Sequence, residues 1–394
     1  MSSSRSREAK LLTSARNLSH DLTVNCFCSA SRERSSYVRA PHAFRWYDPL
    51  VTNSASRNLL EATLVGHGPL FTNPDPDDAR AFFRTKPKQL IDKVMSVADA
   101  VRQFVHDGDY LASGGFGADR IATALLHEIV RQRKQNLGFA GHTATHDFQI
   151  LAAGNLTGRG QLLKRVDAAY IVGLEARGLS PHARRVVQSG EVELCEWSNY
   201  SLALRFQAAA MGVSFLPARS MAGTDTFEQS AAKPITCPFT NAEYVAIPAL
   251  WPDVAIIHVH EADSFGNARI RGTSVADIAV ARAAKHVILS CERLISNDEI
   301  RRDPTATVIP FFCVDAVCEV PFGSFPGNMP YEYYSDEEHL RQWLTVEEDP
   351  ATHQAFLDQH LFGCRDFTEY LELCGGSARL EELRRQELHP ESAG

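Results

Sequence analysis

Short apolar segments alternate with helical segments through the centre of this chain, and this alternation constrains the fold more than any other feature. Apolar runs without a period of two predict buried strands at residues 110–113, 137–141, 168–172, 192–195, 254–259 and 287–290. Apolar residues at helical spacing predict helices at about 97–105, 119–133, 147–153, 202–211 and 274–284. Such strands, separated by helices, favour an α/β fold with an open, mostly parallel sheet and helices on both faces.

The two ends of the chain differ from its centre. Residues 1–73 are rich in serine, arginine and asparagine without periodicity, and we expect a poorly ordered N-terminal extension. Residues 74–330 form the predicted α/β domain. Beyond it, charged amphipathic segments lacking strand signals predict a helical C-terminal extension at 331–394, which packs on the core or on a partner. These segments are 335–344, 350–361 and 378–386.

The composition argues against several classes of protein. A net charge of −8 and a pI near 6.0 give no basic excess for nucleic acid or an anionic membrane. The nine cysteines are scattered and mostly in apolar surroundings, which predicts reduced thiols and a cytoplasmic protein. No run approaches the roughly 18 apolar residues of a membrane span, and no apolar secretory signal opens the sequence. The cysteine pairs have no second pair at zinc spacing, so we expect no metal.

The segment from Asp107 to Gly117 combines a short strand, a glycine turn and a helix start. Such a turn brings a ligand close to backbone N–H groups at the positive end of a helix, which suits an anion or a carbonyl oxygen. The pattern Gly114-Gly115-Phe116-Gly117 lacks the third glycine of a dinucleotide-binding turn, which disfavours a nicotinamide-dependent oxidoreductase. Tight packing between strand and helix is an equally good reading of the turn.

A polar loop directly follows the strand predicted at 137–141. Ligands in open parallel sheets lie beyond the carboxyl ends of strands, so the hydroxyl groups of Thr143 and Thr145 could bind a carboxylate or thioester oxygen. The alternative is that Thr145 or Asp147 only caps the next helix.

Two further turns carry polar side chains. Ser198 and Asn199 lie between a strand and a helix, where a helix cap is the default interpretation. Glu175 also follows a predicted strand and is either a carboxylate in a cleft or a surface residue paired with a nearby arginine. Asp263 and Asn267 flank a Gly-Asn turn, and we favour a stabilised turn over a pocket lip.

Taken together, these segments resemble the alpha (A) subunits of family I CoA-transferases, that of glutaconate CoA-transferase in particular. The likeness covers roughly residues 74–330 and rests on the order of several motifs. These are Asp107-Gly108 with Gly114-Gly115-Phe116, then Gly173-Leu174-Glu175, Gly178-Leu179-Ser180-Pro181 and Asp263-x2-Gly266-Asn267-Ala268. The family signature usually continues after the phenylalanine with three residues, a glycine, one residue and a proline. Arg120 and Ala122 occupy those places here, so we expect a different local turn shape.

The resemblance implies that the chain has no catalytic nucleophile of its own. The family's chemistry rests on a glutamate in a Glu-Asn-Gly-like turn of the beta subunit, whose carboxylate attacks an acyl-CoA thioester. No such segment occurs in this sequence, and the equivalent turn here is Ser198-Asn199-Tyr200. The chain would therefore complete the site across an interface with a beta-type subunit, binding a CoA thioester as substrate and no permanent cofactor.

The resemblance also assigns roles to the candidate residues. The oxyanion or carboxylate cradle would be Gly114, Gly115, Phe116 and Gly117, the substrate hydroxyl donors Thr143 and Thr145, and the residues near the interface Ser198 and Asn199.

Two other functions stay open. The first is a component of a CoA-transferase-like acyl-CoA hydrolase that opens rings in steroid degradation, where the glutamate acts as a base. In those relatives the glutamate lies in the A-type chain near the 198–200 turn, where this chain has Asn199. The second is a catalytically silent scaffold that stabilises a partner. The sequence does not identify the donor and acceptor acids.

Overall fold

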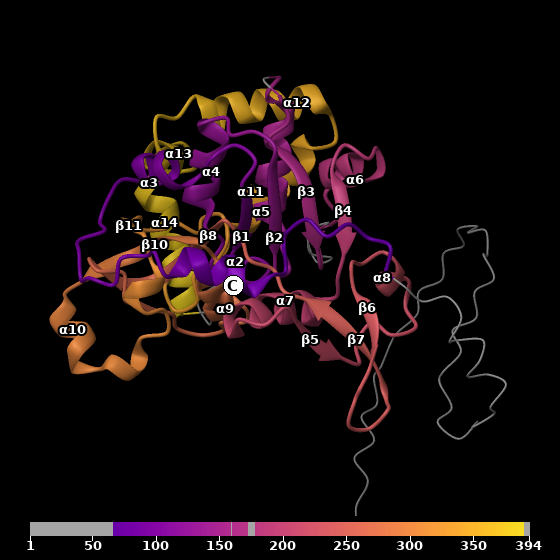
Figure 1. The fold of residues 1–394 in the computed structure, drawn as a ribbon. Coiled ribbons are helices and arrows are strands. Elements are labelled where there is room, and N and C mark those ends of the chain that lie inside the picture. The colour runs from indigo at the N-terminus through magenta and orange to yellow at the C-terminus, as the bar shows by residue number, and fades with distance from the viewer. Residues whose placement is uncertain (1–65, 159, 172–177, 390–394) are drawn as a thin grey trace, which may run out of the picture. The chain divides into compact units, whose positions relative to one another are not determined.

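The main element of the fold is an eight-stranded sheet (Figure 1), seen in a computed structural model that describes residues 66–158, 160–171 and 178–389. The strands follow the order β11-β10-β8-β1-β2-β3-β4 with parallel pairing throughout, and β9 pairs antiparallel with β8. Their bounds are β1 Tyr110–Ser113, β2 Leu137–Gly141, β3 Leu163–Ala168, β4 Glu193–Glu196, β8 Val254–Asp263, β9 Ala268–Arg269, β10 His286–Ile295 and β11 Ala316–Glu319. The predicted mostly parallel sheet is confirmed.

Helices cover both faces of this sheet (Figure 1). One face carries α3 Val97–Phe104, α4 Thr123–Arg131, α5 His146–Ala153, η1 Gly154–Thr157 and α6 Pro181–Gln188, and the other carries α7 Asn199–Met211 and α9 Asp277–Ala283. The side chains of β1 divide between two buried clusters, since Leu111 belongs to one and its neighbours Tyr110 and Ala112 to the other. This alternation is the pleat of a strand that is buried on both faces.

A second, three-stranded antiparallel sheet was not predicted. Its order is β5-β7-β6, with β5 Phe215–Ala218, β6 Lys233–Thr236 and β7 Glu243–Pro248, and α8 Asp225–Glu228 lies between β5 and β6 in the chain. It packs on α7 through Ile247 and Phe206, both members of one buried cluster. The helix α2 Pro76–Phe83, capped by Asp75, was also missed. His67 and Gly68 hydrogen-bond to residues 228 and 230. The proposed division of the chain at residue 73 stays a prediction.

Most predicted elements occur close to their expected positions. β1 and β2 have the predicted bounds, and Ser96 caps α3 by accepting a hydrogen bond from Asp99 N at 3.1 Å. The strand predicted at 168–172 is wrong in its position, because β3 ends at Ala168. Residues 172–177, which include Glu175, lie outside the described part of the chain.

The C-terminal segment is helical, as predicted, and packs against the helices of one sheet face. It contains α11 Glu337–Val346, α12 Pro350–Leu357, the π-helix η4 Asp358–Phe362, α13 Phe367–Leu373 and α14 Gly376–Leu388, of which α13 was not predicted. The remaining elements are α10 Asn297–Arg302, η2 Pro304–Ala306 and η3 Phe311–Cys313. Across the described residues, no helix has the length and apolar character needed to cross a membrane.

Glu347, directly after α11, joins this segment to the core. Its carboxylate accepts hydrogen bonds from Gln149 Nε2 at 3.0 Å, Trp343 Nε1 at 3.0 Å and Ser180 Oγ at 2.5 Å. Burial raises the pKa of Glu347 to about 7, and the hydrogen bond from Ser180 opposes that rise. The C-terminal segment is thus held to α5 and α6 by a carboxyl group whose donors are all uncharged.

Candidate functional site

The glycine turn after β1 and the polar loop after β2 meet at the carboxyl end of the sheet. The two strands are neighbours, and Ser113 pairs with Gly141 where they end. Gly117 N–H donates to Thr143 O at 3.0 Å, and the Thr145 hydroxyl donates to Gly117 O at 2.9 Å. The structure therefore brings together two segments that the sequence singled out separately, at the edge where parallel sheets bind ligands.

Every backbone N–H group of the glycine turn already has a partner. Gly114, Gly115, Phe116 and Gly117 donate to Ile256 O, Asp277 Oδ1, Asp119 O and Thr143 O at 2.9, 2.9, 3.0 and 3.0 Å. The expectation of bare N–H groups facing a ligand is wrong for this arrangement, because a ligand would have to displace one of these hydrogen bonds. A direct substrate contact by the four residues stays a prediction.

Arg120 and Asp277 form a buried ion pair that holds this turn. Arg120 Nη1 lies 2.7 Å from Asp277 Oδ1, Nη2 lies 2.9 Å from Oδ2, and both side chains are 0% exposed. Nη2 also donates to Thr273 O at 2.6 Å. Such two-pronged contacts are the strongest that guanidinium and carboxylate groups make. Because Asp277 Oδ1 also accepts Gly115 N–H, the pair fixes the position of the glycine turn.

The same arginine explains the departure from the family signature. Arg120 has φ of +57°, a left-handed conformation that is easy for glycine and rare for other residues. For a residue with a side chain it costs about 1–3 kcal/mol. The chain accepts this strain because the side chain makes the ion pair with Asp277, a contact that a glycine could not make. The sequence marked Arg120 as a departure but did not indicate its partner.

Gly115 is required by its surroundings, whatever binds nearby. Its φ is +86°, and a Cβ atom there would lie 2.5 Å from Asp119 O and 2.8 Å from Arg120 O. Both contacts are with backbone, which cannot move aside without reshaping the turn. Tight packing thus accounts for this glycine, and a substitution here would distort the turn without testing ligand binding.

The polar loop places both predicted threonines in buried positions. Thr145 occupies the cap position of α5, yet its side chain makes no cap hydrogen bond and donates to Gly117 O. The helix-cap alternative is therefore wrong for Thr145. Thr143 has φ of +54°, and its hydroxyl lies 3.5 Å from His142 Nδ1. The His142 ring in turn lies against Phe116, with centroids 5.4 Å apart.

A titratable carboxyl group that the sequence indicated only as a possible helix cap also lies here. Asp147 Oδ2 accepts a hydrogen bond from Ser113 Oγ at 2.8 Å, at the carboxyl end of β1. Burial raises the pKa of Asp147 to about 6, and the Ser113 hydrogen bond opposes this rise. The signal for its role was its place directly after a polar strand-end loop, but its distance from Ser113 in sequence concealed the contact.

Ser198 and Asn199 have the positions that a helix cap predicts. Ser198 Oγ accepts from Ser201 N at 3.1 Å, and Ser201 Oγ accepts from Ser198 N in return, which is a capping box. Asn199 is exposed, and its backbone hydrogen-bonds to His142. Burial lowers the pKa of His142, and this hydrogen bond opposes the change. The loops after β2 and β4 therefore meet, while the interface role of the two residues stays a prediction.

The later motifs are structural turns in the described residues. Asp263 accepts hydrogen bonds from Phe265 N, Asn267 N and Asn267 Nδ2, as the favoured turn interpretation predicts. Ser180 of the Gly-Leu-Ser-Pro motif caps α6 and donates to Glu347. Nowhere in the described ranges do three or more His, Cys, Asp or Glu side chains gather in a way that could hold a metal ion.

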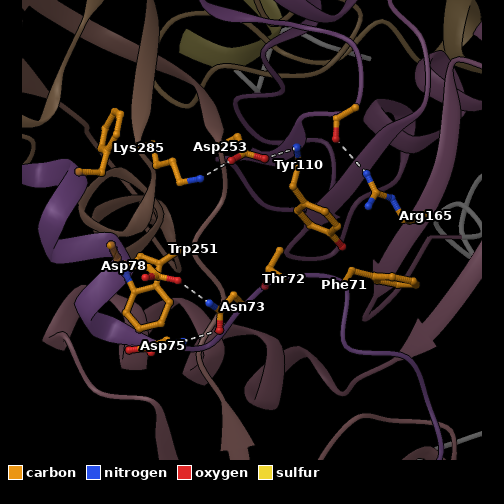
Figure 2. A pocket seen from close by; sticks show the side chains of 13 residues that line it. Phe71, Thr72, Asn73, Asp75, Asp78, Tyr110, Arg165, Trp251, Asp253 and Lys285 are labelled. Atoms are coloured by element: carbon orange, nitrogen blue, oxygen red, sulfur yellow. Dashed lines mark hydrogen bonds and ion pairs between the residues drawn. The ribbon is translucent and has the colours of Figure 1, made fainter.

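A cavity of about 370 Å³ lies at the opposite, amino end of β1 (Figure 2). Its charged groups are mostly satisfied by neighbours: Lys285 pairs with Asp253 at 2.7 Å, and Asp253 also accepts Tyr110 N–H at 2.8 Å. Arg165 donates to Gly108 O at 2.9 Å. None of the predicted site residues lines this cavity, so it is separate from the carboxyl-end site.

Comparison with known proteins matches the parallel sheet and the loops at its carboxyl end. The sequence model of the family described as Coenzyme A transferase matches residues 94–320, more than half of the chain. The chain belongs to the coenzyme A transferase family. It is 33% identical to the alpha (A) subunit of glutaconate CoA-transferase from Acidaminococcus fermentans, over 74% of this chain and 94% of that protein.

Structure and further relatives agree. The crystal structure of glutaconate coenzyme A-transferase from Acidaminococcus fermentans superposes with a TM-score of 0.69, covering 74% of this chain and 95% of that one. An uncharacterized protein of Archaeoglobus fulgidus is 46% identical over 88% of this chain and 77% of its own length. The cholesterol ring-cleaving hydrolase IpdA subunit of Rhodococcus jostii is 26% identical over 70% of this chain and 94% of that protein.

Proposed function

We propose that this chain is the A-type subunit of a heteromeric CoA-transferase that moves CoA between an acyl-CoA and a small, glutaconate-like carboxylic acid. The observation that carries the proposal is the joined glycine turn and polar loop at the carboxyl end of the sheet. The 33% identity to the alpha (A) subunit of glutaconate CoA-transferase supports the substrate class.

The attacking carboxylate belongs, in this proposal, to a beta-type subunit. The sequence has no Glu-Asn-Gly-like segment, and the turn after β4 holds a serine cap and an exposed Asn199 in its place. The partner's glutamate attacks the thioester carbonyl and expels CoA thiolate, forming a mixed anhydride. CoA thiolate then attacks the glutamyl carbonyl of the anhydride, releasing the first acid and leaving a glutamyl-CoA thioester. The second acid repeats these steps in reverse.

This chain contributes the wall of the site that faces the partner. Thr143 and the His142 ring offer polar atoms beside the Phe116 ring, all at the joined loops. Asp147 adds a carboxyl group that titrates near neutral pH and hydrogen-bonds to Ser113. The Arg120–Asp277 pair keeps the glycine turn in place, and preorganised positioning of this kind is a large part of enzymatic catalysis.

The test is reconstitution with a beta-type chain that carries a Glu-Asn-Gly-like turn. We expect the pair to transfer CoA from an acyl-CoA donor to glutaconate, and each isolated chain to be inactive. CoA exchange by this chain alone would refute a nucleophile on the partner. Release of free CoA into water without an acceptor acid would favour the hydrolase, which the similarity to the IpdA subunit keeps in view. A pair that binds but does neither would favour the silent scaffold.

A further inference from the structure

The hairpin formed by β6 and β7 ends in an aromatic side chain that makes little contact with its own chain. Phe239 at the tip is 93% exposed, more than any other large apolar side chain in the described part of the protein. Water strongly disfavours such exposure of a phenyl ring, since burying a large apolar side chain stabilises by about 1.5–3 kcal/mol. Aromatic residues at the centre of an interface are typical anchors of protein–protein binding.

The tip is an ordered structure. Cys237 N donates to Ala242 O at 2.8 Å and Asn241 N donates to Cys237 O at 2.9 Å, which closes the turn. The Thr236 hydroxyl donates to Glu243 Oε1 at 2.8 Å across the base of the loop. The phenyl ring is therefore presented on a preformed turn, and a partner that binds it would lose little entropy in ordering the loop.

The hairpin begins at the carboxyl end of the main sheet. Glu196, the last residue of β4, donates its N–H to Gln229 O at 3.1 Å, and β6 starts four residues later at Lys233. The next residues after β4 form the turn with Ser198 and the exposed Asn199. Figure 1 shows the loop between β6 and β7 projecting beyond the rest of the small sheet. The hairpin thus starts beside the edge at which the candidate site lies and extends outward from it.

We propose that residues 233–248 form a docking arm for the beta-type subunit, with the Phe239 ring inserted into an apolar pocket of that partner. This inference rests on the proposed function, in which the catalytic carboxylate comes from a second chain at the same end of the sheet. The polar residues around the ring, Thr240 and Asn241, match the polar rim that surrounds the anchor of an interface. The arm thereby orients the partner toward the joined loops.

The experiment measures the dissociation constant between this chain and the beta-type subunit for three variants. Phe239→Ser removes the ring, and we expect at least about thirtyfold weaker binding, as for an interface anchor. Phe239→Tyr keeps the ring and should bind within about threefold of the wild type. Phe312→Ser is the matched control, because Phe312 is 52% exposed on η3, a different element. The melting temperature of each free variant checks that the fold is unchanged.

The outcomes separate this inference from the proposed function. If Phe239→Ser binds the beta-type partner as tightly as the wild type, the docking arm is wrong, while CoA transfer by the wild-type pair still supports the function. If the wild-type chain neither binds a beta-type partner nor transfers CoA with it, the proposed function fails first. If Phe239→Ser instead dissociates a homo-oligomer of the isolated chain, the arm binds a second copy, and the partner assignment is overturned.

Discussion

Asp277 and Glu347 are both fully buried carboxyl groups that join distant parts of the chain, but their partners differ. Asp277 is paired with the guanidinium of Arg120 and holds the glycine turn. Glu347 accepts only from uncharged donors and holds the C-terminal helices. A charged partner compensates a buried carboxylate, whereas neutral donors compensate it only in part, and the pKa of Glu347 rises to about 7. The candidate site is thus fixed by charge, and the C-terminal attachment is sensitive to pH.

The largest effect should come from breaking the charged pair. Arg120→Met leaves the carboxylate of Asp277 buried without its counter-charge, and we expect a loss of about 3–5 kcal/mol in the free energy of unfolding. Urea unfolding of the full chain measures this. Arg102→Gln is the control, because the Arg102–Asp99 pair is exposed and should contribute less than about 1 kcal/mol. Equal effects of the two variants would contradict a structural role for the buried pair.

Removing both charges should recover much of that loss. The double variant Arg120→Gly/Asp277→Asn has no buried charge, keeps an oxygen that can accept Gly115 N–H, and relieves the left-handed strain at residue 120. We expect it to be about 2 kcal/mol or more stable than Arg120→Met in the same urea experiment. Additive losses from the two single changes would instead show that the residues act independently.

Truncation of the neutral-donor carboxyl should cost less. Glu347→Ala leaves the donors of Gln149, Trp343 and Ser180 buried without an acceptor, and we expect a loss of about 1–3 kcal/mol. Glu347→Gln retains an acceptor oxygen and should cost no more than about 1 kcal/mol at pH 7. Hydrogen exchange of residues 337–388 locates the effect. Faster exchange confined to the glycine turn would refute the assignment of Glu347 to the C-terminal attachment.

The smallest effect is the pH dependence that Glu347 imposes. Its folded pKa of about 7 lies above the ordinary value of 4.5, so the folded state binds the proton more tightly than the unfolded state. The stabilisation from this group is fully present below pH 4.5 and is lost as the pH rises through 7, with a slope of at most about 1.4 kcal/mol per pH unit. Glu347→Gln should flatten the stability profile between pH 5 and 7 by this contribution. Identical profiles for wild type and variant would contradict it.

Much of the main sheet was predictable from the sequence because its central strands are buried on both faces. Tyr110–Ser113 and Leu137–Gly141 are continuous apolar runs, and their bounds were predicted correctly. β3 was displaced because Lys164, Arg165 and Asp167 interrupt its apolar pattern. In the small sheet, Pro217 and Pro234 hid β5 and β6, and both lie on outer strands, where proline is tolerated.

The candidate site was predictable only as separate segments. Each loop could be placed at a strand end from local patterns alone, which located Thr143 and Thr145. The contacts that decide their chemistry join residues far apart in the sequence. Asp277 lies 157 residues from Arg120, and no local pattern connects them. The expectation of free N–H donors in the glycine turn failed for the same reason, because their acceptors belong to other elements.

The reciprocal hydrogen bonds between Gly117 and the two threonines make the loops after β1 and β2 a single mechanical unit. Gly117 gives its N–H to Thr143 O and takes the Thr145 hydroxyl at its own oxygen, so neither loop can shift without the other. An exchange of one loop alone for that of a relative with another substrate would break both hydrogen bonds. Recombination that preserves this junction must carry residues 114–117 and 143–145 together, and the pair is the smallest module in which substrate choice can be transplanted.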